Sequence, residues 1–173
     1  MDLLIPDIYQ KSIYTISYYK LKQRGIKCLL FDLDNTCSPL LVKKPTIKLI
    51  ELFSKLKDMK FKIIIFSNAS YKRVEPFKKE LLVDSAVRCY KPSKSKFLKV
   101  ITNFNYDLSQ VAIIGDQLFT DILGGNRVGI TTILVNPMST YDKNITKILR
   151  VLEKRWMKKM EKRAIFKKGS YYE

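Results

Sequence analysis

The feature that most constrains the fold is an alternation of short apolar runs with amphipathic stretches between Gly25 and Val135. Continuous apolar runs predict strands over 26–33, 61–66, 111–115 and 130–135, with a weaker strand over 86–90. Apolar residues at helical spacing predict helices over 46–60, 70–80, 93–103 and 118–128. Strands that alternate with helices predict a parallel sheet covered on both faces. We therefore expect an α/β, three-layer, Rossmann-like fold and a single domain over residues 1–173.

The absence of histidine narrows the chemistry available to this chain. It excludes histidine-based triads, histidine general bases and every metal site that needs an imidazole. Catalysis would have to use carboxylates, lysines, hydroxyls, thiols or a metal held by oxygen. The cysteines, Cys28, Cys37 and Cys89, are odd in number and lack CxxC spacing. This favours a reducing, intracellular setting over a disulfide framework or a zinc site.

The charge balance indicates an anionic partner. Lys and Arg number 33 against 16 Asp and Glu, a net charge of +17. Nucleic acid, an anionic membrane or a phosphorylated substrate would each fit. An AT-rich genome would also produce this lysine-rich composition without functional meaning. The N-terminal MDLLIPD has no basic signal-peptide region, and no apolar run is long enough to span a bilayer. We expect a cytoplasmic protein, with peripheral contact at the inner membrane face as a further expectation.

Acidic and polar residues follow the predicted strands at the points where the strands end. Each of four runs is followed by such groups: Asp32 and Asp34, then Ser67 and Asn68, then Lys91, then Asp116 and Asp121. Because parallel strands end at the same edge of a sheet, these side chains are expected to converge there. A single strand-end aspartate is more often a helix cap or turn former. Their joint arrangement favours a site.

The chemistry of such a cluster follows from the residue types. Converging carboxylates repel one another unless a cation lies among them, and oxygen ligands in this number suit Mg²⁺. A carboxylate beside Mg²⁺ can attack phosphorus to form an aspartyl-phosphate. A second carboxyl can protonate the leaving oxygen and later activate water. A hydroxyl and a lysine can bind the remaining phosphoryl oxygens.

At these residues the chain resembles the haloacid dehalogenase-like superfamily of Mg²⁺-dependent phosphohydrolases. The motifs are FDLDNT (31–36), FSNAS (66–70), YKP (90–92) and IIGDQLFTD (113–121), within a motif core of 26–135. The resemblance implies Asp32 as nucleophile and Asp34 as general acid and base. It implies phosphate binding by Ser67, Asn68 and Lys91. Mg²⁺ would be held by Asp32, Asp116 and the backbone carbonyl of Asp34, with Asp121 as an auxiliary ligand.

A closer resemblance extends over most of the chain. IPDIYQKSIYTI (5–16), GIKCLLFDLDNT (25–36) and GDQLFTDILGGNRVGITTILV (115–135) are similar to the YqeG family of subfamily IIIA phosphatases. That family is related to phosphatidylglycerophosphate phosphatases. Cys37 departs from the pattern, since the family usually has an apolar residue there. We expect it to pack as a small hydrophobe, because no basic residue lies within two positions.

The motif spacing predicts a capless site. Only 33 positions separate Asp34 from Ser67, and 24 separate Ser67 from Lys91, which one helix and one strand already fill. An open site favours a phosphate displayed on something large, such as a lipid surface, a nucleic-acid end or a protein.

The two ends of the chain bear on the choice among these substrates. A basic amphipathic helix is predicted over about 145–166, with an apolar stripe of Ile145, Ile148, Leu149, Leu152, Trp156 and Met160. The stripe would either rest on an anionic membrane or pack on the sheet of the domain. Near the N-terminus, Tyr9, Tyr14, Tyr18 and Tyr19 would likewise be interfacial anchors or cover a core edge.

The sequence thus predicts a Mg²⁺-dependent phosphomonoester hydrolase that acts through an aspartyl-phosphate at Asp32, with phosphatidylglycerophosphate as the substrate. One alternative is a phosphatase of nucleic-acid ends or phosphoproteins. Another is a non-catalytic RNA-binding or assembly protein on the same fold. The net charge favours this alternative, but the sequence contains no RNA-recognition motif.

Overall fold

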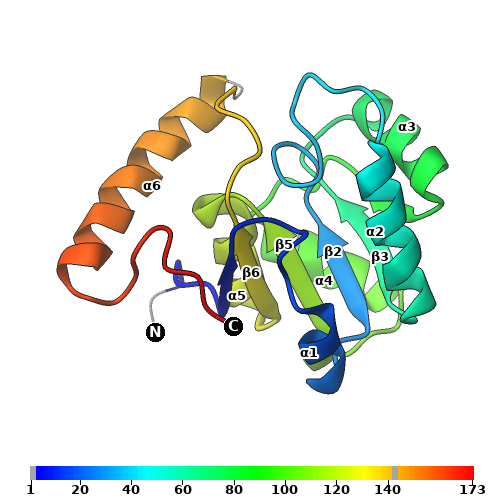
Figure 1. Cartoon of the computed structure of the whole chain (residues 1–173), viewed down its shortest axis with the longest axis horizontal. Coiled ribbons are helices and arrows are strands. Elements are labelled where there is room, and N and C mark those ends of the chain that lie inside the picture. Colours follow the sequence, from blue (N-terminus) through cyan, green and yellow to red (C-terminus); the bar gives the residue numbers. More distant parts are fainter. Residues whose placement is uncertain (1–2, 142–143) are drawn as a thin grey trace.

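The computed structural model describes residues 3–141 and 144–173, and its framework is one six-stranded parallel sheet (Figure 1). The strand order is β1-β6-β5-β2-β3-β4. The strands are β1 (Ile8–Gln10), β2 (Cys28–Phe31), β3 (Lys62–Phe66), β4 (Asp84–Ala86), β5 (Val111–Gly115) and β6 (Thr131–Val135). Every pair of neighbours is parallel, as the sequence pattern predicts.

Helices cover both faces of the sheet, so that two hydrophobic clusters flank it. On one face lie α1 (Tyr18–Gln23), α2 (Ile47–Asp58) and α3 (Tyr71–Leu81). On the other lie α4 (Lys94–Asn103) and α5 (Leu123–Val128). The central strands are buried on both sides, and alternate residues of β2 supply the two clusters: Leu29 and Phe31 face α2, whereas Cys28 and Leu30 face α4. This is the expected three-layer α/β/α arrangement.

Between the first two motifs the chain forms only a loop, α2 and β3, and no inserted domain interrupts this described stretch. The sequence prediction of a capless fold therefore agrees with the arrangement of these elements. The segment between β3 and Lys91 likewise contains only α3, β4 and a loop.

Two predicted elements differ from the structure, and two further elements were not predicted. The weak strand expected over 86–90 is wrong in place: β4 occupies Asp84–Ala86, and Arg88 and Tyr90 have left-handed φ values of 49°. The helix expected over 118–128 begins with a π-helical turn, Leu118–Ile122, that leads into α5. The strand β1 and the helix α1 were not predicted. Tyr9 and Tyr18 are buried in this N-terminal segment, Tyr14 is half-buried and Tyr19 is exposed.

The C-terminal helix α6 spans Asn144–Lys162 and ends before the predicted boundary. Its inner side joins a third cluster, in which Trp156 and Met160 pack with Phe166 and β1 residue Tyr9. Of the two alternatives for the predicted stripe, packing on the domain holds for Trp156 and Met160 but not for Ile148 and Leu152, which are 65% and 43% exposed. The side chain of Ile145, also assigned to the stripe, lies outside the described residues. No described helix combines the length and apolar character needed to cross a bilayer.

Candidate active site

The strand register explains why distant motifs meet. Phe31 of β2 lies opposite Ile65 of β3 and Ile114 of β5. The residues that follow these positions therefore emerge together at the carboxyl edge of the sheet. Asp32 follows β2 directly, and its backbone N–H donates to the Ile114 carbonyl at 2.9 Å. This is the edge at which ligands bind in open parallel sheets.

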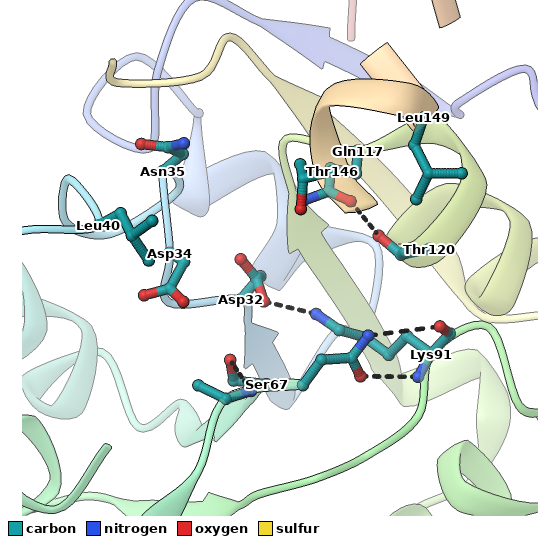
Figure 2. Close-up of a pocket in the computed structure, with 12 residues that line it drawn as sticks. Asp32, Asp34, Asn35, Leu40, Ser67, Lys91, Gln117, Thr120, Thr146 and Leu149 are labelled. Atoms are coloured by element: carbon teal, nitrogen blue, oxygen red, sulfur yellow. Dashed lines mark hydrogen bonds and ion pairs between the residues drawn. The ribbon is translucent and has the colours of Figure 1, made fainter. Parts of the chain in front are cut away.

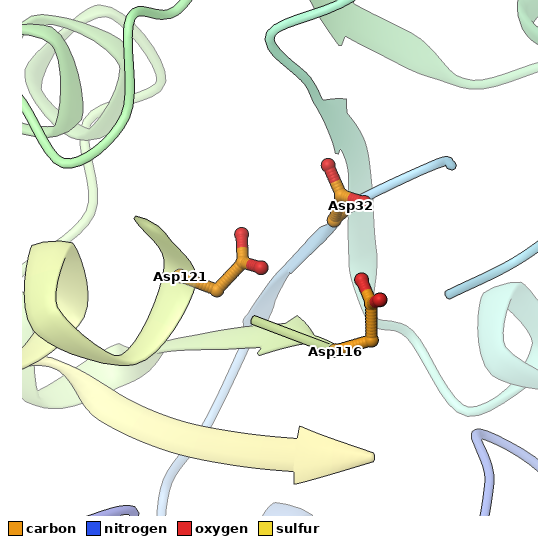
Figure 3. A group of neighbouring side chains, drawn as sticks. All are labelled: Asp32, Asp116 and Asp121. Carbon is orange, nitrogen blue, oxygen red and sulfur yellow. The ribbon is translucent and has the colours of Figure 1, made fainter. Parts of the chain in front are cut away.

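Three buried aspartates form a compact cluster at this edge (Figure 3). Asp32, Asp116 and Asp121 each place a carboxylate oxygen within 4.8 Å of the other two. Asp121 reaches the cluster from the π-helical turn, and Gly115 leaves room for it. A Cβ at Gly115 would lie 2.2 Å from Asp121 Cγ. A side chain at Gly115 would therefore displace one member of the aspartate triad.

Lys91 pairs with two members of the triad. Its Nζ lies 2.6 Å from Asp32 Oδ1 and 2.6 Å from Asp121 Oδ1, and it donates to the Phe66 carbonyl at 3.0 Å. Burial alone would lower the pKa of Lys91, but the two carboxylates raise it above its ordinary value. Asn68 fixes the backbone of Lys91, since its Oδ1 accepts a hydrogen bond from the Lys91 backbone N–H at 2.7 Å.

Asp116 is held from two sides. Thr36 Oγ1 donates to Asp116 Oδ1 at 2.9 Å, and Arg150 of α6 pairs with Oδ2 and donates to the Asp116 carbonyl at 2.7 Å. Arg150 also contacts Glu153 at 3.0 Å, and Glu153 accepts from the Leu118 backbone N–H at 2.6 Å. The C-terminal helix is therefore fastened to the loop that carries Asp116.

The electrostatics of the cluster fit a divalent cation. Burial raises the pKa of Asp116 to about 7, although Arg150 opposes the shift. Burial likewise raises the pKa of Asp32 to about 6, with Lys91 opposing and Asp121 adding to the shift. Four buried carboxylates, the triad and Glu153, face two cations, Lys91 and Arg150. This excess of negative charge on hard oxygen ligands suits Mg²⁺.

Asp34 lies beside the triad but is oriented differently. Its Oδ1 accepts from Arg73 Nε of α3 at 2.9 Å. The same guanidinium donates to the carbonyls of Val42 and Pro39, the latter at 3.2 Å. Arg73 therefore fixes both the Asp34 carboxylate and the loop that follows β2.

A pocket of about 290 Å³ lies at this edge of the sheet (Figure 2). Asp32, Asp34, Ser67 and Lys91 lie around its floor. Ser67 Oγ accepts from the Ala69 backbone N–H at 3.2 Å, which leaves its hydroxyl hydrogen available for a ligand. The walls come from the loops after β2, β3 and β5, the π-helical turn and α6: Asn35, Leu40, Asn68, Ala69, Gln117, Thr120, Thr146 and Leu149.

The structure brings all seven predicted site residues to the same edge. Three of them, Asp32, Asp116 and Asp121, form the triad, whereas the Asp34 carboxylate lies outside it. Sequence reasoning missed Arg73, Arg150 and Glu153, and gave Thr36 no role although it belongs to the FDLDNT motif. Cys37 is buried, and burial raises its thiol pKa well above the ordinary range. An uncharged, buried Cys37 agrees with its interpretation as a small hydrophobe.

An open parallel sheet with an aspartate triad and a lysine at its carboxyl edge defines a haloacid dehalogenase-type phosphatase. In agreement with this, a HAD-hydrolase-like family model matches residues 88–146. Among curated proteins, the chain is 36% identical over 160 residues to the "Probable phosphatase YqeG" of Bacillus subtilis (strain 168), covering 92% of this chain and 93% of that protein. The chain belongs to the YqeG family of HAD phosphatases.

A more distant relative is phosphatidylglycerophosphate phosphatase 1, chloroplastic/mitochondrial, of Arabidopsis thaliana. The two are 27% identical over 174 residues, which cover 91% of this chain and 49% of the plant protein. The chain thus spans about half the length of that relative. Among solved structures, the D,D-heptose 1,7-bisphosphate phosphatase from B. bronchiseptica, complexed with magnesium and phosphate, superposes with a TM-score of 0.51. It is 16% identical, with 63% of this chain and 80% of that chain covered, and it shows the fold.

Proposed function

We propose that the protein hydrolyses phosphomonoesters with Mg²⁺ through an aspartyl-phosphate at Asp32. The observation that carries the proposal is the aspartate triad, packed against Lys91 on the floor of an open pocket. Family membership supports the phosphatase activity, and the surplus of buried carboxylates supports the metal.

In the first step, a carboxylate oxygen of Asp32 attacks phosphorus, and the bond between phosphorus and the ester oxygen breaks. Asp34 donates a proton to the departing oxygen. In the second step, Asp34 takes a proton from water, whose oxygen attacks phosphorus and releases phosphate and Asp32. Lys91 and the Ser67 hydroxyl bind phosphoryl oxygens during both steps.

Asp32, Asp116 and Asp121 would hold the metal ion. When bound, Mg²⁺ would offset the repulsion among the carboxylates and the charge of the phosphoryl oxygens. Thr36 and Arg150 orient Asp116, whereas Lys91 orients Asp32 and Asp121. The side chains of the chain therefore set the direction of each ligand oxygen.

Turnover of p-nitrophenyl phosphate tests the proposed mechanism. The wild type should require Mg²⁺, and Asp32→Asn should reduce kcat by roughly a thousandfold or more, because it removes the nucleophile. Asp84→Asn is a matched control, since Asp84 of β4 pairs with Lys62 of β3 and does not line the pocket. Equal turnover by wild type and Asp32→Asn would refute the assignment.

We further propose phosphatidylglycerophosphate as the substrate, hydrolysed to phosphatidylglycerol. The Arabidopsis relative, the open pocket and the net charge of +17 support it. The experiment is phosphate release from phosphatidylglycerophosphate in anionic vesicles, compared with soluble sugar phosphates, phosphopeptides and 5′-phosphorylated oligonucleotides. The lipid should have the highest kcat/KM. A preference for any of the other substrates would overturn the lipid assignment but leave the phosphatase chemistry intact.

A further inference from the structure

The mouth of the catalytic pocket is surrounded by exposed apolar side chains that the chemistry does not use. They are Leu41, Met138, Tyr141, Ile148 and Leu152, which we call the apolar rim, with exposures of 67%, 43%, 54%, 65% and 43%. They come from three segments: the loop after β2, the connection from β6 to α6, and α6. The loop after β2, the connection from β6 to α6 and the N-terminal end of α6 lie toward the top of Figure 1, and from there α6 runs down one side of the molecule. Exposed apolar residues gathered in one place mark an interaction site.

On each side, the wall of the pocket continues outward into the rim. Leu40 lines the pocket, and its neighbour Leu41 is exposed. Across the mouth, Leu149 lines the pocket, and Leu152 and Ile148 continue the apolar surface, because residues three and four apart are neighbours on a helix. Figure 2 shows Leu40 and Leu149 on opposite sides of Asp32.

Asn35 joins the third segment to the mouth. Its Nδ2 donates to the Tyr141 carbonyl at 2.9 Å, its Oδ1 accepts from Ser139 Oγ at 2.7 Å, and its carbonyl accepts from the Met138 N–H at 2.8 Å. Asn35 itself lines the pocket. The rim is therefore held in a fixed relation to the catalytic floor.

The exposed charged residues of the rim segments are basic, and one of them, Lys44, pairs with Glu80 of α3 at 3.7 Å. In the described segments 38–48, 136–141 and 144–155, the exposed charged residues are Lys43, Lys44, Lys48, Lys147, Lys154 and Arg155. The one acidic residue in these segments, Glu153, is buried and paired with Arg150. Apolar side chains surrounded by basic ones are typical of surfaces that insert into an anionic bilayer.

We propose that the apolar rim docks on an anionic lipid surface, so that the catalytic pocket opens directly onto the bilayer. This inference rests on the proposed function and adds the partner surface and the orientation of the enzyme on it. A lipid phosphate at the headgroup level could then enter the pocket while the rim side chains enter the interface. An RNA partner fits less well, since four of the five rim residues are aliphatic or methionine and offer no ring for base stacking.

The test is co-sedimentation with vesicles made of equal parts of phosphatidylglycerol and phosphatidylcholine. The rim variant Leu41→Gln/Ile148→Gln should bind at least about tenfold more weakly than the wild type, because two exposed apolar side chains are lost. The matched control is Leu82→Gln/Leu108→Gln, which removes exposed apolar side chains from the C-terminal end of α3 and from the segment that precedes β5. The control should bind like the wild type. Circular dichroism should show both variants folded.

Turnover of p-nitrophenyl phosphate in solution separates this inference from the proposed function. The rim variant should keep wild-type turnover, since neither substituted residue lines the pocket. Absence of turnover in the wild type would refute the proposed function, whereas vesicle binding is measured without turnover. Equal vesicle binding by wild type and rim variant would overturn the docking surface. Binding of single-stranded RNA in place of vesicles, unaffected by the rim variant, would also overturn it.

Discussion

Arg73 and Arg150 each pair with one aspartate of the site, and the proposed roles of these two aspartates differ. Arg73 pairs with Asp34, and Arg150 pairs with Asp116. Lys91 meanwhile contacts Asp32 and Asp121. Each aspartate therefore has a cationic partner, but the Asp34 carboxylate alone is turned away from the triad. In the proposed mechanism, this separation would assign metal binding and proton transfer to different side chains.

Asp34→Asn should therefore abolish proton transfer without abolishing metal binding. We expect kcat to fall at least about a hundredfold, the usual contribution of a general acid and base. Isothermal titration calorimetry should show Mg²⁺ affinity within about threefold of the wild type, because the triad keeps its carboxylates; a shift of that size is under about 1 kcal/mol. Asp116→Asn is the matched comparison, and it should lose both. Loss of metal binding in Asp34→Asn would contradict the separation.

The motif residues could be predicted because each follows a strand, and parallel strands end together. Arg73, Arg150 and Glu153 could not be predicted, since nothing local marks them. Their partners lie 39, 34 and 35 positions away, and the pairing depends on how helices pack on the sheet. Thr36 differs from these three residues, since it lies within the FDLDNT motif, and only its hydrogen-bond partner Asp116 could not be predicted.

Among the elements, α6 shows most clearly where a sequence pattern is insufficient. The apolar stripe left open whether that face packs on the domain or on a membrane, and the structure buries Glu153 and half-buries Arg150, which turns Ile148 and Leu152 outward. The polar pair accounts for the rotation of the helix, because Arg150 donates to the Asp116 carbonyl and Glu153 accepts from the Leu118 N–H. By contrast, β2, β3, β5 and β6 were predicted within two residues from continuous apolar runs. β1, with three residues, is too short to show a pattern.

If Glu153 anchors α6, then Glu153→Ala should destabilise the protein strongly. It leaves the Leu118 N–H without its buried acceptor and removes one of the two carboxylates that pair with Arg150, and leaving a buried donor unsatisfied costs about 1–3 kcal/mol, more when a charged group is lost. Urea unfolding monitored by the fluorescence of Trp156 on the same helix would measure the loss. Glu161→Ala, at an exposed position of α6, is the control and should change the free energy of unfolding by less than about 0.5 kcal/mol. Similar losses in the two variants would contradict an anchoring role for Glu153.

For the whole molecule, the buried triad couples stability to pH. The pKa values of Asp32 and Asp116, about 6 and about 7, lie above those of an unfolded chain, so the folded protein binds more protons in this window. The contribution of these two groups to the free energy of unfolding therefore falls as pH rises from about 4 to about 7. Lys91 acts in the same sense but at alkaline pH: because its pKa is raised in the folded state, its stabilising contribution is complete below the pKa of an unfolded lysine and is lost as pH rises above that value.

Mg²⁺ should reverse this loss of stability, because the cation replaces the protons among the same oxygens. We therefore expect the increase in Tm on adding Mg²⁺ to be larger near pH 7.5 than near pH 5.5, where protons compete for the carboxylates. At about a hundred times its Kd, the cation would stabilise the folded protein by about 2.7 kcal/mol at the higher pH. Differential scanning calorimetry with MgCl₂ or with EDTA at both pH values measures the effect. Asp116→Asn should lose most of it, and an increase in Tm independent of pH would show that Mg²⁺ binds elsewhere.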